Sequence, residues 1–237
     1  MEKPMRTIYS QWRCLLTTVI FSAALAAGVS TNAADVELVP LPLKLPLPTL
    51  KGTPDELPKG PGIEPPPEKP RPAFSAPKGT KNVAAGKKVT SSDRNPVFGD
   101  LSMITDGNKE AIDAHVIELR KGVQWVQIDL GEVCEVYAVV MWKDHRVLQV
   151  CRGVVVQAAD DPDFIDNVTT LFNNDTENVT GQGIGTDRQY FETQQGKLIP
   201  VKNVKTRYLR FYSKGSNLTA MNGYQEIEVY GQPAKGK

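Results

Sequence analysis

The sequence predicts an all-β fold, an eight-stranded jelly-roll β-sandwich, preceded by a signal peptide and a Pro-rich linker. From about residue 82 onward, short β-branched and aromatic runs are separated by Gly, Asn and Asp, which is the pattern of short strands joined by turns. No long amphipathic helix is predicted in this region. About eight such strands fit a sandwich or jelly roll of roughly 150 residues.

The strand predictions rest on side-chain alternation. The stretch "GVQWVQIDLG" places Val126, Ile128 and Leu130 on one face. The runs "CEVYAVVMW" and "RGVVVQAAD" are more continuously apolar, as expected for central strands covered on both faces. Further strands are predicted in "VTTLFN", "RQYFET", "TRYLRFYS" and "YQEIEVYG", with Leu209 and Phe211 sharing one face.

The first 34 residues have the pattern of a signal peptide. Lys3, Arg6 and Arg13 precede the apolar run "CLLTTVIFSAALAAGVS", and a stretch of small residues follows. Cleavage after Ala33 or Ala34 is expected, and the alternative is a membrane anchor. The prediction is therefore a secreted protein, periplasmic or extracellular.

The composition divides the rest of the chain into three parts. Residues 35–80 contain a proline every few residues and predict an extended linker, because proline favours polyproline II and removes backbone donors. Residues 81–231 form the predicted domain, and 232–237 a short tail. The opening of the linker is more apolar than a free linker usually is.

Charge and cysteine content set limits on partners and chemistry. A net charge of +1 indicates neither nucleic acid nor an anionic membrane as a partner. Cys14 would leave with the signal peptide, so Cys134 and Cys151 remain in a chain bound for an oxidising compartment. The sequence leaves open whether these two form a disulfide or stay as free buried thiols.

Six phrases occur in a distinctive order: "NVAAGKKVTSS", "MITDGN", "VQWVQIDLG", "VVVQAADDPDF", "TRYLRFYSKGS" and "YQEIEVYG". Together they resemble the discoidin domain, also called the coagulation factor V/VIII type C domain, and the related galactose-binding-like carbohydrate-binding modules, in a variant of secreted bacterial proteins. The resemblance spans residues 82 to 231. It implies an eight-stranded jelly roll with ligand loops at one end and a structural calcium ion nearby, while function has to be argued from the site.

The resemblance implies calcium ligands in "ITDGN" and "QEIEV". Asp106 and Asn108 match the loop, and Glu226 matches the Glu of the last strand. Calcium is a hard ion that takes six to eight oxygen ligands. The hydroxyl residue that often follows in such loops is absent here, and the alternative is a simple Asp-Gly turn.

The resemblance also implies ligand contacts in "WKDHR". Asp144, His145 and Arg146 are the candidates for bonding ligand hydroxyls, and Asn222 and Tyr224 for the facing wall. A sugar suits such a site because it has a C–H-rich face and a rim of donors and acceptors. The alternative for this loop is a solvated turn with an Arg-Asp pair, and alternation groups Trp142 with the core.

Catalysis is not expected from these residues. The chain has two histidines, and neither a nucleophile elbow nor an HExxH motif accompanies them. His115 and His145 without a third recognisable ligand make a weak zinc site. The long insert "FNNDTENVTGQGIGTD" offers oxygens but lacks the spacing of an EF-hand.

The sequence therefore predicts a secreted, non-enzymatic module that binds a glycan or another cell-surface ligand. The alternative is a protein-protein adhesion or scaffolding module of the cell envelope. Nucleic acid is not expected as a partner, and membrane lipid ranks below both alternatives because "WKDHR" and "FNND" are polar. The oligomeric state is left open.

Overall fold

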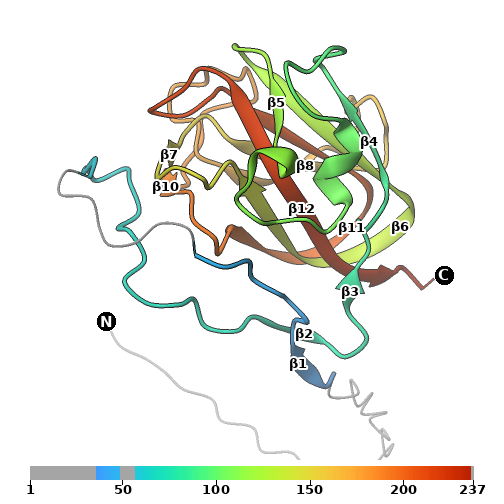
Figure 1. Cartoon of the computed structure of the whole chain (residues 1–237). Coiled ribbons are helices and arrows are strands. Elements are labelled where there is room, and N and C mark those ends of the chain that lie inside the picture. Colours follow the sequence, from blue (N-terminus) through green and yellow to red (C-terminus); the bar gives the residue numbers. More distant parts are fainter. Residues whose placement is uncertain (1–35, 49–56, 236–237) are drawn as a thin grey trace, which may run out of the picture. The chain divides into compact units, whose positions relative to one another are not determined.

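The computed structural model describes residues 36–48 and 57–235, and its regular elements are almost all strands (Figure 1). The prediction of an all-β fold is confirmed. The elements are β1 (Leu38–Pro40), β2 (Ser75–Pro77), β3 (Lys81–Asn82), β4 (Lys88–Ser91), η1 (Leu101–Thr105), η2 (Asp113–His115), β5 (Ile117–Leu119), β6 (Gln124–Lys143), β7 (Val150–Cys151), β8 (Val155–Ala159), β9 (Thr169–Asn173), β10 (Tyr190–Phe191), β11 (Lys197–Ser213) and β12 (Asn222–Pro233). Of these, η1 and η2 are short 3₁₀ helices.

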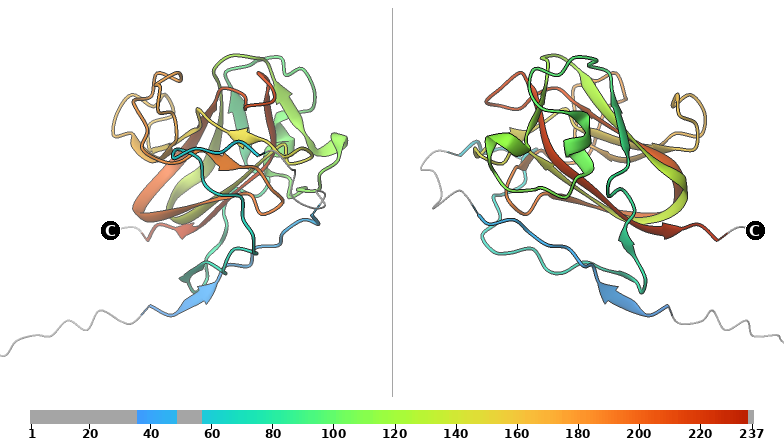
Figure 2. Two further views of the ribbon diagram at one scale, coloured as in Figure 1. Left: turned by 90° about the vertical axis from the view of Figure 1, so that its left-hand side faces the viewer. Right: turned by 45° about the vertical axis from the view of Figure 1, so that its right-hand side comes forward.

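Two long antiparallel strands, β6 and β11, build both layers of the sandwich (Figures 1 and 2). The first half of β6 pairs with β4 and with the second half of β11, which continues to β8 and β9. The second half of β6 pairs with the first half of β11 and with β12, which also pairs with β3 and β5. We call these the first and second sheets.

The two sheets join where β6 and β11 bend together. The pairing of β11 with β6 shifts register between Pro200 and Val204, and again between Thr206 and Tyr208. Gly131 (φ 83°) and Asn203 (φ 57°) adopt the left-handed backbone conformation at this bend. Glycine and asparagine tolerate that conformation best, which explains why the strands turn here.

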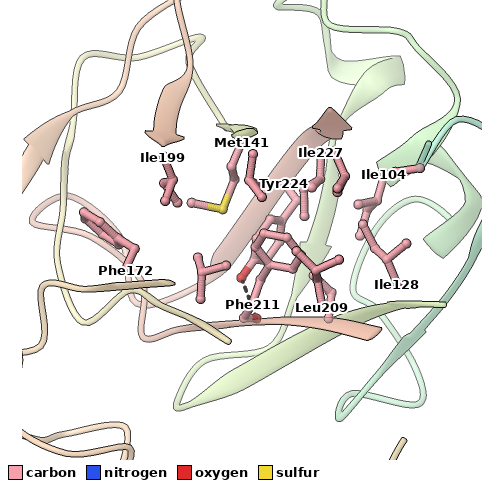
Figure 3. Close-up of a cluster of buried hydrophobic side chains, with 14 of the residues drawn as sticks. Ile104, Ile128, Met141, Phe172, Ile199, Leu209, Phe211, Tyr224 and Ile227 are labelled. Atoms are coloured by element: carbon pink, nitrogen blue, oxygen red, sulfur yellow. Dashed lines mark hydrogen bonds between the residues drawn. The ribbon is translucent and has the colours of Figure 1, made fainter. Parts of the chain in front are cut away.

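The main core lies between the sheets. Val126, Ile128 and Leu130 are all buried in it, as the alternation of β6 predicts. Leu209 and Phe211 lie in the same core, so their predicted common face is confirmed. Figure 3 shows side chains from β6, β11 and β12 meeting there, with the Tyr224 hydroxyl donating to the Phe211 carbonyl oxygen across 3.4 Å.

A second apolar cluster covers the outer face of the second sheet. Ala138, Val140, Trp142 and Tyr230 form it, and all four are buried. The residues that pack on this cluster from outside are Leu41, Leu43, Phe74 and Leu198. The Pro-rich segment supplies the first three of these, so it lies against the domain.

The Pro-rich segment is also held by backbone and side-chain bonds. Its two described parts pair with each other through β1 and β2 (Figure 2). Arg71 then binds the turn before β11, and Glu64 forms an ion pair of 2.5 Å with Lys197. In the text below, "strap" means residues 36–48 and 57–80.

Three further predictions concern the signal peptide, the membrane anchor and the disulfide. The predicted signal peptide, residues 1–34, lies outside the described residues. Within the described part of the chain, no helix is long and apolar enough to cross a membrane. Cys134 and Cys151 are both buried and free, so this structure has no disulfide between them.

Candidate binding site at the loop end

Several strand ends meet at one end of the sandwich. Lys143 at the end of β6 pairs with Tyr224 near the start of β12, and Val155 at the start of β8 pairs with Asn173 at the end of β9. Ser213 at the end of β11 pairs with Gln124 at the start of β6. Because β6 bends between the two sheets, its start and its end lie at the same end of the sandwich, where Ser213 also bonds Asn222. The loops 144–149, 152–154, 174–189 and 214–221 therefore leave the sheets at this end, which we call the loop end.

The structure places His145 inside the protein. Its side chain has no exposed surface, and its Nε2 lies 2.8 Å from the carbonyl oxygen of Lys109. Its backbone N–H donates to Gln225 Oε1 across 3.2 Å. Burial holds the pKa of His145 below its ordinary value, so the ring is neutral. The prediction that His145 contacts a ligand is therefore wrong for this conformation.

Asp144 and Arg146 bind each other beside it. Arg146 donates from Nε to Asp144 Oδ1 across 2.8 Å and from Nη2 to Oδ2 across 2.6 Å, and it also contacts Asp113. The Asp144 side chain is 19% exposed and that of Arg146 is 29% exposed. A ligand that bound these two side chains would have to compete with this ion pair. Their ligand contacts stay a prediction.

Asn222 and Tyr224 are internal residues. Asn222 Oδ1 accepts from Ser213 Oγ and from the Gly215 N–H, both at 2.8 Å. Its Nδ2 donates to the carbonyl oxygens of Arg120 and Gly122. Tyr224 lies in the main core and has no exposed surface. The prediction that these two form a ligand wall is wrong, because their polar groups already serve the fold.

A polar pocket of about 190 Å³ opens nearby in the loop end. It lies between the turn that follows β7, the start of the long insert and the first residue after β11. The residues that line it are Arg152, Gly153, Asn174, Asp175, Thr176, Glu177, Val179, Gln189 and Lys214. We call this the loop-end pocket.

Two side-chain amides, buried Asn174 and exposed Asn217, hold the walls of the loop-end pocket together. Asn174 Oδ1 accepts from the Val154 N–H across 2.7 Å, and Asn174 Nδ2 donates to the Cys151 carbonyl across 3.0 Å. Asn217 Oδ1 accepts from the Val150 N–H across 2.7 Å. These bonds join three loops through the protein's own groups, so the fold itself shapes the pocket.

The acidic residue Asp175 stabilises the long insert. It accepts from the N–H groups of Val179 and Thr180 and from the Thr180 hydroxyl. Burial acts to raise its pKa, but these hydrogen bonds prevail and hold the pKa below its ordinary value. Asp175 is therefore ionised and engaged, which leaves Glu177 as the exposed acid of the pocket.

The sequence indicated Asn174 and Asp175 as sources of oxygen ligands, but not the basic and amide side chains that line this pocket with them. Sequence reasoning treated the insert as a source of oxygens or a loop, and it did not consider Arg152, Gln189 or Lys214. A usable signal existed, since Arg152 directly follows β7 and Lys214 directly follows β11. Polar residues that directly follow strands ending at one edge come together in space.

The predicted cation loop brings Asp106, Asn108 and Glu226 together. The Gly107 N–H donates to Glu226 Oε2 across 3.0 Å, and Asn108 binds both carboxylate oxygens of Asp106. Glu226 is fully buried, and its Oε1 has no hydrogen-bond partner. Burial, with Glu228 and Asp106 nearby, raises the pKa of Glu226 to about 9.

These residues fit an oxygen-coordinated cation. Lys109 pairs with Glu228 at 2.5 Å, so it does not compensate Glu226 by a direct bond. A buried carboxylate oxygen without a partner is costly unless a cation meets it. No group of three or more His, Cys, Asp or Glu residues forms a metal site within the described residues, so carbonyl oxygens would have to complete the shell.

A pair of buried ionisable residues, Lys143 and Glu192, lies at the loop end, where β6 ends. Lys143 and Glu192 are almost fully buried, and neither Lys143 Nζ nor Glu192 Oε1 has a hydrogen-bond partner. The Lys143 ammonium lies 4.8 Å from the centre of the Tyr224 ring. Burial lowers the pKa of Lys143 and raises that of Glu192 to about 8. Burial therefore shifts both groups toward their neutral forms.

Comparison with known proteins gives structural likenesses at low identity. No family model matches the chain, and no curated protein does. A chitosan-binding module of a chitosanase/glucanase from Paenibacillus sp. IK-5 is 20% identical, with a TM-score of 0.46 over 64% of this chain and 99% of that one. A fucose-binding module from Streptococcus pneumoniae is 17% identical, with a TM-score of 0.45 over 66% and 99%.

A Clostridium perfringens module in complex with GlcNAc-α-1,4-galactose is 20% identical, with a TM-score of 0.45 over 65% of this chain and 96% of that one. A family 89 glycoside hydrolase from the same organism is 16% identical, with a TM-score of 0.47 over 65% of this chain. This chain spans only 15% of that hydrolase.

Proposed function

We propose that this protein is a secreted binding module that recognises a glycan through the loop-end pocket. The observation that carries the proposal is the preformed polar pocket of about 190 Å³, whose walls are joined by Asn174 and Asn217. The order of sequence phrases that resembles galactose-binding-like modules supports the same function.

The chemistry of the pocket suits a sugar. Arg152, Lys214 and the Gln189 amide offer donors, and Glu177 offers an acceptor. A sugar hydroxyl can both donate and accept, so it can use donors and acceptors that lie side by side. The volume is below the usual range for drug-sized ligands, which favours a single sugar ring over a long segment.

We propose binding without turnover. Glycosidases of the common type place two carboxyl groups across the scissile bond. In this pocket the carboxylate of Asp175 accepts three hydrogen bonds from its own loop, so Glu177 would face a ligand without an available acidic partner. Incubation of the full chain with a bound glycan should release no product, and release of a shorter sugar would contradict the proposal.

We also propose a structural calcium ion held by Asp106, Asn108 and Glu226. Calcium would supply positive charge to the unpartnered oxygen of Glu226 and would stabilise the loop after η1. This calcium loop contacts the loop end through Lys109, whose carbonyl oxygen lies 2.8 Å from Nε2 of His145 in the loop 144–149. The proposed role is stability of the fold.

Secretion follows from the proposed signal peptide. Expression of the whole chain in a secreting bacterial host should give a product that begins at residue 34 or 35. N-terminal sequencing of the exported protein checks this, and an uncleaved chain that stays in the membrane fraction would support the anchor alternative.

A second candidate function is adhesion to a protein partner. Val147 is 47% exposed and Leu218 is 60% exposed, and both lie on loops of the loop end. Exposed apolar residues of this kind are typical of protein interaction surfaces. A glycan array probed with the mature full chain separates the two functions. Binding to at least one glycan, reduced in Gln189→Ala, supports the glycan function, and binding to none favours the protein partner.

A further inference from the structure

Two cations are built into the wall of the loop-end pocket. Arg152 is followed by Gly153, which has a φ of 61°. A Cβ on Gly153 would lie 3.6 Å from Lys214 Cβ and 3.3 Å from Val179 Cγ2. The backbone after Arg152 therefore passes against Lys214, which brings both cationic side chains to the same pocket.

The backbone around both cations is fixed. An isolated β-bridge joins Cys151 to Ser216, and the Asn217 N–H donates to the Val150 carbonyl across 3.2 Å. The residue before Arg152 and the loop after Lys214 are thus bonded to each other. The fold therefore sets the relative position of the two backbone sites from which Arg152 and Lys214 project.

Neither cation is paired with a carboxylate within the described residues. Three other arginines in this part of the chain are held by acids: Arg120, Arg146 and Arg207, the last by Asp129 at 2.8 Å. The structure shows no ion pair of 4.0 Å or less for Arg152 or Lys214 among residues 36–48 and 57–235. Both charges are therefore available to a ligand.

The pocket also contains two acids, which differ in how far they are exposed to a ligand. Asp175 is ionised, but its carboxylate accepts bonds from Val179 and Thr180 and is only 2% exposed. Glu177 is exposed and carries one negative charge toward the ligand space. The formal charges of the four side chains balance, but two cations and only one acid, Glu177, are exposed to a ligand.

We propose that the loop-end pocket selects glycans that carry an anionic group, a carboxylate or a sulfate ester. Arg152 binds two oxygens of that group with its planar guanidinium, and Lys214 adds a second positive charge. Glu177 accepts from a neighbouring hydroxyl. This inference rests on the proposed glycan function and names its substrate class.

The test uses two matched pairs of polysaccharides with the mature full chain. Polygalacturonate and its fully methyl-esterified form differ in the carboxylate charge. Carrageenan and its chemically desulfated form differ in the sulfate ester. Calorimetric titration is expected to show binding to at least one anionic member, at least tenfold weaker binding to its uncharged counterpart, and a loss of affinity at high salt.

Variants link the selectivity to the pocket. Arg152→Gln and Lys214→Gln should each weaken binding to the anionic polysaccharide by about 10- to 100-fold, the effect of losing a charged hydrogen bond. Lys202→Gln removes the same charge at the opposite bend, beside Asn203, and should leave the affinity unchanged. Thermal unfolding of each variant establishes that the fold is intact.

Three results would overturn the inference. Equal binding to charged and uncharged counterparts would overturn it while leaving the glycan function in place. Anionic binding that survives both pocket substitutions would place the site elsewhere. Binding to no glycan, in this test and on an array, would remove the proposed function and the inference together.

Discussion

The guanidinium of Arg71 donates to the carbonyl oxygen of Gly196 across 2.9 Å, and so joins the strap to the turn before β11. The same side chain donates to the Gln195 carbonyl, and the Arg71 N–H donates to Gln195 Oε1. Beneath this turn, Trp142 Nε1 donates to the Gln194 carbonyl. The strap therefore stabilises the outer face of the second sheet.

Loss of the Arg71 side chain should destabilise the domain. Arg71→Ala leaves two half-buried carbonyls without their charged donor, so we expect a decrease of about 1–3 kcal/mol in the free energy of unfolding. Urea unfolding followed by tryptophan fluorescence measures it. Lys69→Ala, an exposed neighbour in the strap, should change the free energy by less than about 0.5 kcal/mol. Equal effects of the two substitutions would contradict the role of Arg71.

Loss of the Asn174 amide should open the loop-end pocket. Asn174→Ala removes one acceptor and one donor from buried backbone partners, and we expect a loss of about 2–4 kcal/mol. Hydrogen exchange should accelerate at the Val154 N–H. The exposed neighbour Thr176→Ala is the control and should leave both quantities unchanged. Unchanged exchange at Val154 in Asn174→Ala would show that the amide does not join the loops.

The alternation of apolar residues predicted the core of the first sheet but only part of the second. Val126, Ile128 and Leu130 lie in the main core as expected. The sequence groups Trp142 with Val136, but Val136 lies in the main core and Trp142 in the outer cluster. The cause is a register shift between Tyr230 and Gly231 of β12, which exchanges the two faces of β6.

The site could be predicted less well than the fold because it depends on long-range contacts. The sequence places His145 in a polar loop, and nothing nearby in the chain indicates that Lys109 and Gln225 enclose it. Asn222 and Tyr224 follow a turn rich in polar residues, yet their partner Ser213 lies on another strand. Burial of such side chains follows from tertiary packing, which alternation does not encode.

Lys143 and Glu192 should show opposite pH dependences when each is left alone. In Glu192→Gln, burial holds the pKa of Lys143 in the fold below the value of 10.5 that the group has in the unfolded chain. The unfolded state then binds more protons, so stability should rise with pH by up to about 1.4 kcal/mol per unit. In Lys143→Met, Glu192 keeps its proton in the fold up to about pH 8, so stability should fall as pH rises from about 4.5.

In the wild-type protein these two slopes of stability against pH have opposite signs, so they cancel over the pH interval that they share. Urea unfolding at a series of pH values, taken as the difference from wild type, measures them. The double variant should differ from wild type by an amount that does not depend on pH over that interval. Slopes of the same sign in the two single variants would contradict the account of a neutral buried pair.

Calcium should raise the melting temperature of the domain. Removal of calcium with a chelator is expected to lower it, because Glu226 Oε1 then has no partner in the interior. Glu226→Gln and Asp106→Ala should each abolish the response to calcium, measured by differential scanning calorimetry. Asp166→Ala, an exposed acid beyond β8, should leave the response intact. A wild-type melting temperature that calcium does not change would exclude the ion.

The central claim is that a glycan binds in the loop-end pocket. Amide chemical shifts of the isotopically labelled full chain, recorded during titration with an anionic oligosaccharide, test it most directly. The account predicts saturable changes at Arg152, Gly153, Lys214 and the residues from Asn174 to Val179, with none at the opposite bend. Changes confined to other residues, or no saturable change with any oligosaccharide, would contradict it.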